Sequence, residues 1–260
     1  DSLPEKEWLI KHDSSYLEKS LLHQIFWQIF LLPKEVETNK CDILLNTDAG
    51  AISFFKPSVT MSRDMLSYEP GEIERYKLGF SRLRLIALKF IQNRSLKRSQ
   101  GVIFLTKYAG SVIQQSTGKL DCVEYIPHGV GKAFSDLKFI PTTFEGRTVK
   151  LLYVSNADLY KHQWNVVKAV ENLRHLNFQV QLTLVGGGSG EALKKLKDQI
   201  QISDPDEDYV FFKEFVAQSD LPQYLLDADI YVFASSCENM PNTLLEGMSA
   251  GLPIACSNRG

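Results

Sequence analysis

The sequence is poor in cysteine and lacks any long hydrophobic run. Its four cysteines, Cys41, Cys122, Cys237 and Cys256, lie far apart and form no C-x-x-C pair. This spacing argues against a cysteine metal site and favours a reducing compartment, so we expect a cytoplasmic protein. Cys122 and Cys256 lie in strand-like runs, where buried, reduced thiols are expected. No apolar run approaches the ~18–20 residues of a membrane-spanning helix.

The two ends of the sequence lack the features of a complete chain. It begins with Asp1 rather than methionine, and no signal-peptide pattern follows. It stops at Gly260, just after an apolar run and inside a turn-like segment. We therefore expect an incomplete N-terminal domain and a truncated C-terminal domain.

No strong excess of either charge sign is present. The formal net charge is −2 and 44% of the residues are hydrophobic, which indicates a globular protein without a nucleic-acid partner. The basic residues concentrate in 75–98, where eight Lys and Arg are interleaved with Leu, Ile and Phe and no acid occurs. A basic amphipathic helix can lie on an anionic membrane surface, so peripheral contact with the inner face of a membrane is one prediction. The alternative is a helix that docks on the first sheet with a solvated basic face.

Short apolar runs alternate with longer amphipathic stretches along the sequence. The runs typical of strands buried on both faces are 41–46, 58–62, 101–106, 122–127, 150–155, 179–186, 209–212, 229–235 and 252–257. The stretches typical of helices are 15–31, 72–98, 107–116, 162–175, 190–200, 219–227 and 241–250. Repeated alternation of strand and helix predicts an α/β fold with parallel sheets.

The alternation weakens after Gly129, in a stretch with glycine, proline and threonine and no clear period. We interpret this stretch as a junction, with an N-terminal domain over 1–131, a linker over 132–148 and a C-terminal domain over 149–260. Ligands of such folds bind outside the carboxyl ends of the strands, so a cleft between the two domains is the expected active site.

Three loops in the second half each follow a predicted strand, and their residues suit a sugar nucleotide. They are 155–163, which contains Lys161, then the glycine-rich 186–190, then 235–242, which contains Glu238. Because the carboxyl ends of parallel strands share one edge of a sheet, we expect a basic residue, a glycine-rich turn and a carboxylate to converge there.

The third loop leads into a predicted helix that suits an anion. Pro241 is expected as the first helical residue, since its missing N–H would have no partner there. The N–H groups expected to point out of the helix start are those of Asn242, Thr243 and Leu244. Such a helix start is suited to a diphosphate. Glu238 before it and Glu246 inside it can each accept two hydrogen bonds from neighbouring sugar hydroxyls.

These segments carry a resemblance to a known family. ENMPNTLLEGMSAGLPI is similar to the E-x7-E segment of the retaining GT-B glycosyltransferases of family 4, with Glu238 and Glu246 at the acidic positions. LLYVSNADLYKHQ resembles the strand and loop that bear the family's phosphate lysine, here Lys161. The other similar segments are LTLVGGGSG, ADIYVFASS, GVIFLT and VEYIPHGVGKAF, so the resemblance covers most of the chain. It implies two Rossmann-like domains that face a cleft.

The resemblance also implies roles for individual residues. It implies that Glu246 holds the donor ribose hydroxyls, that Glu238 contacts the transferred sugar, and that Lys161 neutralises the diphosphate. The further donor-binding residues it implies are Gly186, Gly187, Met240, Pro241, Asn242, Thr243 and Phe215, with Phe212 to Phe215 near the base. The family needs no metal in the donor site, and we expect no cofactor.

Acceptor-side residues are expected in the N-terminal domain. Arg63 and Asp64 follow a predicted strand, and His128 lies near the end of the domain, where a structural turn is an equal alternative. The D-x-D segments at 204–208 and 227–229 are more simply interpreted as solvent loops or caps than as metal sites.

The sequence departs from the family pattern at two positions. Many members carry an arginine five residues before the lysine, and here that position is Asn156. This leaves one fixed cation where two are common. Many have glycine in the F-x-G segment, where this sequence has Glu214, which puts the base-binding loop in doubt.

The expected function is transfer of a hexose from a UDP- or GDP-linked donor to a glycan or lipid-linked acceptor, with retention of anomeric configuration. One alternative is a non-catalytic module that binds nucleotide sugars. Another is a nicotinamide-dependent oxidoreductase. Against the latter, Gly186 and Gly188 fit G-x-G-x-x-G, but Glu191 replaces the last glycine.

Overall fold

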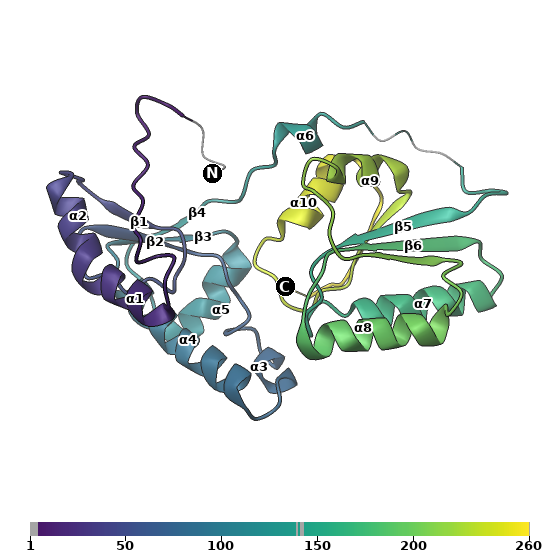
Figure 1. Cartoon of the computed structure of the whole chain (residues 1–260), viewed down its shortest axis with the longest axis horizontal. Helices are drawn as coiled ribbons and strands as arrows, with labels where there is room; N and C mark the ends of the chain where they lie inside the picture. Colours follow the sequence, from purple (N-terminus) through teal and green to yellow (C-terminus); the bar gives the residue numbers. More distant parts are fainter. Residues whose placement is uncertain (1–4, 139, 141–142, 260) are drawn as a thin grey trace.

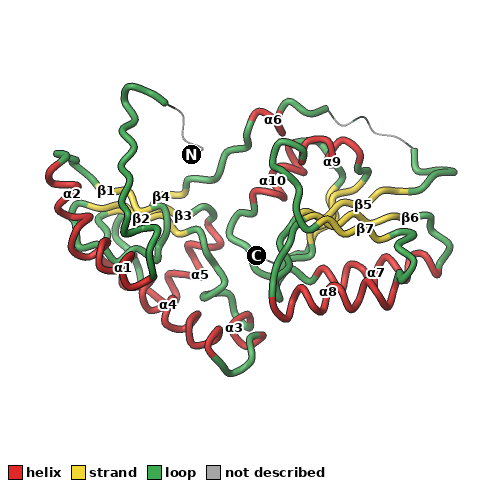
Figure 2. The backbone as a smooth tube through the Cα atoms, viewed as in Figure 1, coloured by secondary structure: helices red, strands yellow, loops and turns green. Residues whose placement is uncertain are grey.

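The structure is a computed structural model that describes residues 5–138, 140 and 143–259. Two parallel sheets form the two halves of the molecule (Figure 1, Figure 2). In the described residues, the N-terminal sheet consists of β1 (Leu44–Asn46), β2 (Ser58–Ser62), β3 (Gly101–Phe104) and β4 (Val123–Tyr125), in that order. The C-terminal sheet consists of β5 (Val149–Val154), β6 (Val180–Val185), β7 (Val210–Lys213), β8 (Ile230–Phe233) and β9 (Ile254–Cys256). Each predicted strand is confirmed, within a few residues at its ends.

The order of the C-terminal sheet is β7-β6-β5-β8-β9, so the strand order reverses between β5 and β8: β6 and β7 lie on one side of β5, and β8 and β9 on the other. Register pairs across this point include Leu151 with Ile230 and Leu152 with Tyr231. Such a reversal opens a crevice at the carboxyl edge, where ligands of doubly wound sheets bind. The strands form because their Val, Leu and Tyr side chains are buried on both faces, with Tyr153 and Tyr231 almost fully enclosed.

Helices cover both faces of the C-terminal sheet (Figure 1). One face carries α7 (Gln163–His175) and α8 (Gly190–Ser203), and the other carries α9 (Leu221–Asp227) and α10 (Asn242–Ser249). In the N-terminal half the helices are α1 (Leu21–Phe26), η1 (Trp27–Leu31), α2 (Leu32–Thr38), α3 (Glu72–Arg75), α4 (Phe80–Arg98) and α5 (Lys107–Thr117). This layered arrangement is the predicted α/β fold.

Two predicted helices were wrong in extent. The helix expected over 15–31 begins only at Leu21 and continues to Thr38 through a π-helical turn. The turn precedes Pro33, whose ring lacks an N–H and crowds the preceding turn of helix. The helix expected over 72–98 is interrupted at 76–79, where Gly79 is fully extended, so α3 and α4 are separate.

The segment between the sheets is partly folded. It contains α6 (Lys132–Ser135), whose Phe134 is buried and belongs to the C-terminal core cluster. α6 also packs against α10. We propose that the division between the halves lies within 132–148. The predicted linker contains positions 139 and 141–142, which lie outside the described residues.

Cysteine burial differs from the prediction. Cys122 and Cys256 are exposed rather than buried, because Cys122 lies just before the edge strand β4 and Cys256 ends the edge strand β9. Cys237 is buried, and it packs into the core cluster of the N-terminal half although it belongs to the C-terminal half. Among the described residues, no helix is both long and apolar enough to cross a membrane.

Candidate functional site

The three loops predicted to converge do meet at the reversal point. The loop after β5 donates a hydrogen bond from Ala157 N to Gly187 O (2.7 Å) in the loop after β6. The loop after β8 donates from Ser236 N to Tyr160 O (2.8 Å) in the loop after β5. Main-chain bonds therefore fix the three loops against one another at the carboxyl edge of the sheet.

Gly186 and Gly187, at the start of the glycine-rich loop, have no room for side chains. A Cβ at Gly186 would lie 2.4 Å from Ser155 O, and the φ of Gly186 is 126°. A Cβ at Gly187 would lie 3.0 Å from Glu214 O. Gly186 N also donates to Lys213 O (2.9 Å). The two glycines thus allow the loops after β5 and β7 to approach the loop after β6 closely.

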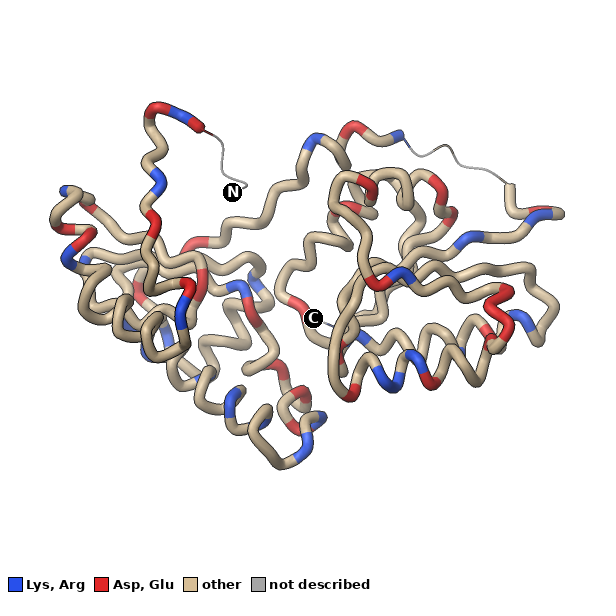
Figure 3. Tube along the Cα trace, viewed as in Figure 1, with Lys and Arg blue, Asp and Glu red and all other residues tan. Residues whose placement is uncertain are grey.

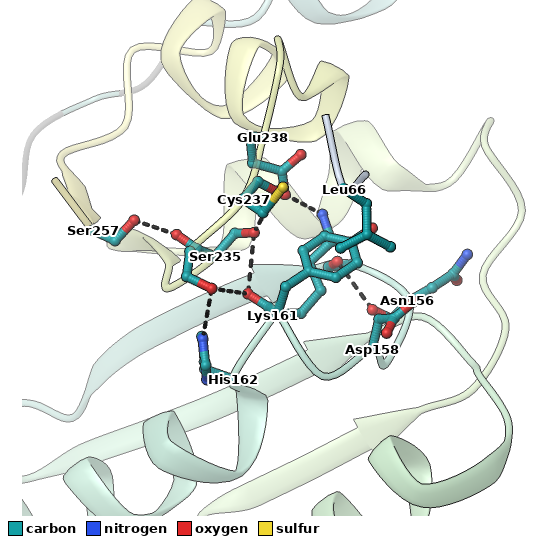
Figure 4. Close-up of polar contacts among 12 residues, drawn as sticks. Leu66, Asn156, Asp158, Lys161, His162, Ser235, Cys237, Glu238 and Ser257 are labelled. Atoms are coloured by element: carbon teal, nitrogen blue, oxygen red, sulfur yellow. Dashed lines mark hydrogen bonds and ion pairs between the residues drawn. The ribbon is translucent and has the colours of Figure 1, made fainter. Parts of the chain in front are cut away.

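Lys161 and Glu238 form an ion pair between the first and third loops (Figure 4). Their side chains are only 13% and 17% exposed, so the pair is largely shielded from water. The Lys161 ammonium also lies 4.9 Å from the ring centroid of Tyr160 and 5.3 Å from that of Phe233. The site therefore contains a cation held by a carboxylate and two aromatic rings.

The two residues that depart from the family pattern, Asn156 and Glu214, lie away from this ion pair. Asn156 is exposed, and Figure 4 shows its side chain directed away from Lys161. Glu214 forms an ion pair with Lys197 (2.5 Å). Next to it, Phe215 is 86% exposed on the loop after β7.

The start of α10 differs by one residue from the prediction. Pro241 is the N-cap, with extended backbone, rather than the first helical residue, and its carbonyl accepts from Leu244 N (3.2 Å). The proline ring therefore precedes the helix, and the N–H of Leu244 is already bonded. In the described part of the chain, the N–H groups of Asn242 and Thr243 have no acceptor. Two rather than three N–H groups are therefore available for an anion.

Glu246 lies one turn into α10 and is half-buried. Burial raises the pKa of its carboxyl above the ordinary value. No side-chain hydrogen bond to Glu246 occurs among the described residues. The next residue, Gly247, lets the helix approach Tyr231 of β8, because a Cβ there would lie 2.9 Å from the ring.

The predicted acceptor-side residues lie at the carboxyl edge of the N-terminal sheet, opposite the three loops of the C-terminal half. His128 N lies 3.1 Å from the sulfur of Met240, so this residue reaches the loop before α10. Burial and the charge of the exposed Arg63 lower the pKa of His128. Asp64 accepts from Leu66 N (2.9 Å), which fixes its own loop.

The two D-x-D segments serve structural roles. Asp204 is buried and accepts from the N–H groups of Tyr209 (2.8 Å) and Val210 (2.7 Å), as a cap does. Asp229 forms a bidentate ion pair with Arg147, with both contacts at 2.7 Å.

Sequence reasoning missed a set of contacts between the halves. Glu72 accepts from Ser236 Oγ (2.7 Å), and Asn239 Nδ2 donates to Ser62 O (3.0 Å). Glu72, Ser236 and Asn239 are all buried. More than 160 residues separate the partners along the chain in each pair, so no local pattern could have indicated them.

Comparison with known proteins gives a family match for the C-terminal half and structural neighbours that share the fold. Residues 136–260 match the sequence profile of the family described as glycosyl transferases group 1. Protein CapJ of Staphylococcus aureus is 21% identical over 183 residues, which are 70% of this chain and 44% of CapJ. Spore coat protein SA of Bacillus subtilis (strain 168) is 27% identical over 114 residues, 42% of this chain and 30% of that protein. This chain therefore matches less than half the length of either curated relative.

Solved structures share the architecture. Anabaena Alr3699/HepE, solved in complex with UDP-glucose, has a TM-score of 0.68 at 21% identity and covers 87% of this chain and 63% of its own. Sucrose-phosphate synthase from Thermosynechococcus elongatus has a TM-score of 0.66 at 19% identity, with 88% and 61% covered. These likenesses show that the fold is GT-B.

Proposed function

We propose that this chain carries the donor site of a glycosyltransferase using nucleoside-diphosphate sugars, because residues 136–260 match the glycosyl transferases group 1 family. The observation that carries the proposal is the position of Lys161 and Glu238. They lie together at the reversal point of a doubly wound sheet, beside the start of α10. A cation, two available helix N–H groups and a carboxylate are the groups that a diphosphate linked to a sugar requires.

In the proposed mechanism, Lys161 and the N–H groups of Asn242 and Thr243 bind the diphosphate. As the sugar leaves, negative charge grows on the phosphate oxygens, and these donors stabilise it. The diphosphate competes with Glu238 for Lys161, because both are anions. Donor binding therefore releases Glu238, whose carboxylate is then available to the hydroxyls of the transferred sugar.

Glu246 is proposed to bind the ribose. A carboxylate accepts one hydrogen bond at each oxygen, which matches two neighbouring ribose hydroxyls. Glu246 is half-buried, and no side chain that the structure describes hydrogen-bonds to it. Hydroxyl donors are therefore favourable there, because burial without hydrogen bonds penalises the charged form. Phe215, highly exposed beside the glycine loop, is proposed to contact the base.

We propose a uridine donor first and a guanosine donor second, because Alr3699/HepE was solved with UDP-glucose. The transferred group is proposed to be a hexose, passed with retention to a glycan or lipid-linked acceptor. Arg63, Asp64 and His128 face the donor loops from the other half and are proposed to bind that acceptor. Proton NMR of the product tests retention through the anomeric coupling.

The experiment that tests the donor class is calorimetric titration with UDP, GDP and NAD⁺, followed by assay of UDP-glucose turnover. We expect UDP or GDP to bind and NAD⁺ not to bind. Turnover of UDP-glucose separates an enzyme from a non-catalytic binding module. Binding of NAD⁺ without binding of either nucleoside diphosphate contradicts the proposal.

We also propose that α4 contacts an anionic membrane surface from the cytoplasmic side. Phe80, Leu83 and Phe90 are 82%, 66% and 71% exposed, and Lys and Arg recur along the helix (Figure 3). A cavity of about 220 Å³ lies beside its C-terminal half, where Phe90 and Ile52 line it together with Arg94 and Arg98. Exposed aromatic side chains can contact lipid acyl chains, and the neighbouring Lys and Arg side chains can bind anionic headgroups.

A further inference from the structure

Glu72 is a buried carboxylate in the N-terminal half whose hydrogen-bond partner belongs to the C-terminal half. It begins the short helix α3 and is 3% exposed. Ser236 Oγ lies 2.7 Å from Glu72 Oε1, and Arg75 Nε lies 2.7 Å from Oε2. One carboxylate oxygen therefore pairs with Arg75 of its own helix, and the other accepts a hydrogen bond from Ser236 in the loop before α10.

The same hydroxyl continues to His162. Ser236 Oγ lies 2.9 Å from His162 Nε2. A carboxylate only accepts, and Glu72 Oε1 lies closer to Ser236 Oγ (2.7 Å) than Tyr160 O does (3.3 Å). The hydroxyl proton of Ser236 is therefore assigned to Glu72, and His162 Nε2–H donates to Ser236. Burial, followed by the charge of Arg75, lowers the pKa of His162, and the charge of Glu72 opposes this shift less strongly. A lowered pKa favours the neutral ring. The three side chains thus form a directed chain of hydrogen bonds from His162 to Glu72.

His162 occupies a backbone conformation that favours glycine. Its φ is 56° and its ψ is 25°, at the N-cap of α7. A non-glycine residue in this region is uncommon, and such strain concentrates where surrounding contacts enforce it. The ring is held by Ser236 and by an edge contact with Trp164, with centroids 5.6 Å apart. A glycine would fit the backbone without strain, so the side chain is the reason for a histidine here.

The chain of hydrogen bonds joins the segments that carry Lys161 and Glu238. His162 directly follows Lys161, and Ser236 lies two residues before Glu238. On the other side of Glu238, Asn239 is also held by the N-terminal half, through Ser62 O. Glu238 therefore lies between two residues that the N-terminal half fixes, while its own carboxylate faces back to Lys161.

The N-terminal half contacts the first loop as well. Tyr76, the residue after α3, donates from its hydroxyl to Asp158 Oδ1 (2.9 Å). One short segment of the N-terminal half, from Glu72 to Tyr76, therefore touches both loops of the ion pair.

We propose that Glu72, Ser236 and His162 are positioning residues that couple closure of the two halves to the geometry of the Lys161–Glu238 pair. Separation of the halves breaks the bond between Glu72 and Ser236, which frees the loop before Glu238 and the residue after Lys161. The proposal rests on the proposed donor site, because it assigns these residues to the support of that site. None of the three needs to touch the substrate.

The test compares hydrogen exchange in the segments 158–163 and 235–240 with and without UDP, together with small-angle X-ray scattering. Glu72→Ala removes the acceptor, whereas Glu72→Gln keeps an oxygen that can accept from Ser236. We expect Glu72→Ala to speed exchange in both segments by about tenfold and to enlarge the radius of gyration, since a hydrogen bond to a charged group is lost. Glu72→Gln should stay close to the wild type in both measurements.

Two further variants keep the test decisive if Glu72→Ala folds poorly. Ser236→Ala deletes only one hydroxyl and should reproduce the faster exchange. His162→Gly relieves the backbone strain and removes the ring, so it should loosen 158–163 even if the protein unfolds at a higher temperature. Wild-type exchange in Ser236→Ala, or equal opening by Glu72→Gln and Glu72→Ala, overturns the proposal.

The outcome is separable from that of the proposed function. Failure of UDP to bind the wild-type chain overturns the uridine donor site. The exchange rates and scattering of the free protein still decide whether the three residues hold the halves together.

Discussion

Lys161 and Glu238 are interdependent, because each is the other's charge partner in a largely shielded position. Replacing Lys161 leaves the Glu238 carboxylate uncompensated, whereas replacing Glu238 leaves a lysine free for another anion. The two substitutions should therefore have opposite effects on diphosphate binding. This asymmetry follows from the ion pair and could not be derived from the E-x7-E spacing.

At the residue scale, Glu238→Ala is predicted to separate binding from turnover. Loss of the competing carboxylate should leave the UDP dissociation constant equal or lower. Turnover of UDP-glucose should fall by about a hundredfold or more, since the sugar loses its proposed partner. Calorimetry and a hydrolysis assay measure the two effects. Asp198→Ala is the matched control, because that carboxylate is exposed on α8, outside the proposed site. A large loss of UDP affinity in Glu238→Ala contradicts the competition.

The raised pKa of Glu246 predicts pH-dependent binding of UDP-glucose. Ribose hydroxyls donate to the ionised carboxylate, so binding lowers a pKa that burial has raised. Affinity should be complete above the pKa of the free site and should fall as the pH decreases through that pKa. UDP-glucose is the suitable probe because its diphosphate has no terminal phosphate that titrates in this range. Calorimetry of the wild type and Glu246→Gln across this range provides the measurement. Identical pH profiles would show that Glu246 is not the titrating group.

At the element scale, the strands of both sheets were predictable because short Val-, Leu- and Ile-rich runs have few alternatives to burial. Helix ends were less predictable. The break at 76–79 depends on Gly79 and on the docking of α3 against the other half. The helix-forming residues on both sides of it favour one continuous helix in a sequence-based prediction. The N-cap position of Pro241 likewise depends on a one-residue shift that spacing alone does not determine.

Gly186→Ala should damage the packing of the donor loops. Its φ of 126° and the 2.4 Å approach to Ser155 O leave no place for a Cβ. We expect a loss of roughly 2–4 kcal/mol in the free energy of unfolding, measured by denaturant titration. Gly190→Ala is the control, because Gly190 also has a positive φ (68°) but nothing within 4 Å of its Cβ position. That variant should lose about 1 kcal/mol, the cost of the backbone conformation alone. Equal losses in the two variants would refute the steric explanation.

Two sets of α4 variants test the membrane proposal. Phe80→Ser with Phe90→Ser removes apolar contacts, and Arg82→Gln with Arg84→Gln removes charge. Both pairs should weaken co-sedimentation with vesicles that contain phosphatidylserine, and the second pair should reduce its salt dependence, at about 1 kcal/mol per basic residue near the surface. Equal binding of the wild type to neutral vesicles would exclude an electrostatic contribution.

At the scale of the whole molecule, sequence reasoning predicted the fold and the convergence of the donor loops but not the contact between the halves. The loops could be predicted because parallel strands direct them to one edge. Cys237 packs into the N-terminal core cluster, and Asn239 bonds to β2. These contacts depend on the relative position of two sheets, which no local periodicity encodes.

The measurement that tests the donor site most directly is calorimetric titration of UDP and GDP into the wild type, Lys161→Ala and Glu246→Ala. Each variant removes a proposed charged partner of the nucleotide, so affinity should fall about ten- to a hundredfold, the equivalent of roughly 1.5–3 kcal/mol. Lys168→Ala, an exposed lysine on α7, is the control and should bind like the wild type. Unchanged affinity in both Lys161→Ala and Glu246→Ala would contradict the assignment of the donor site.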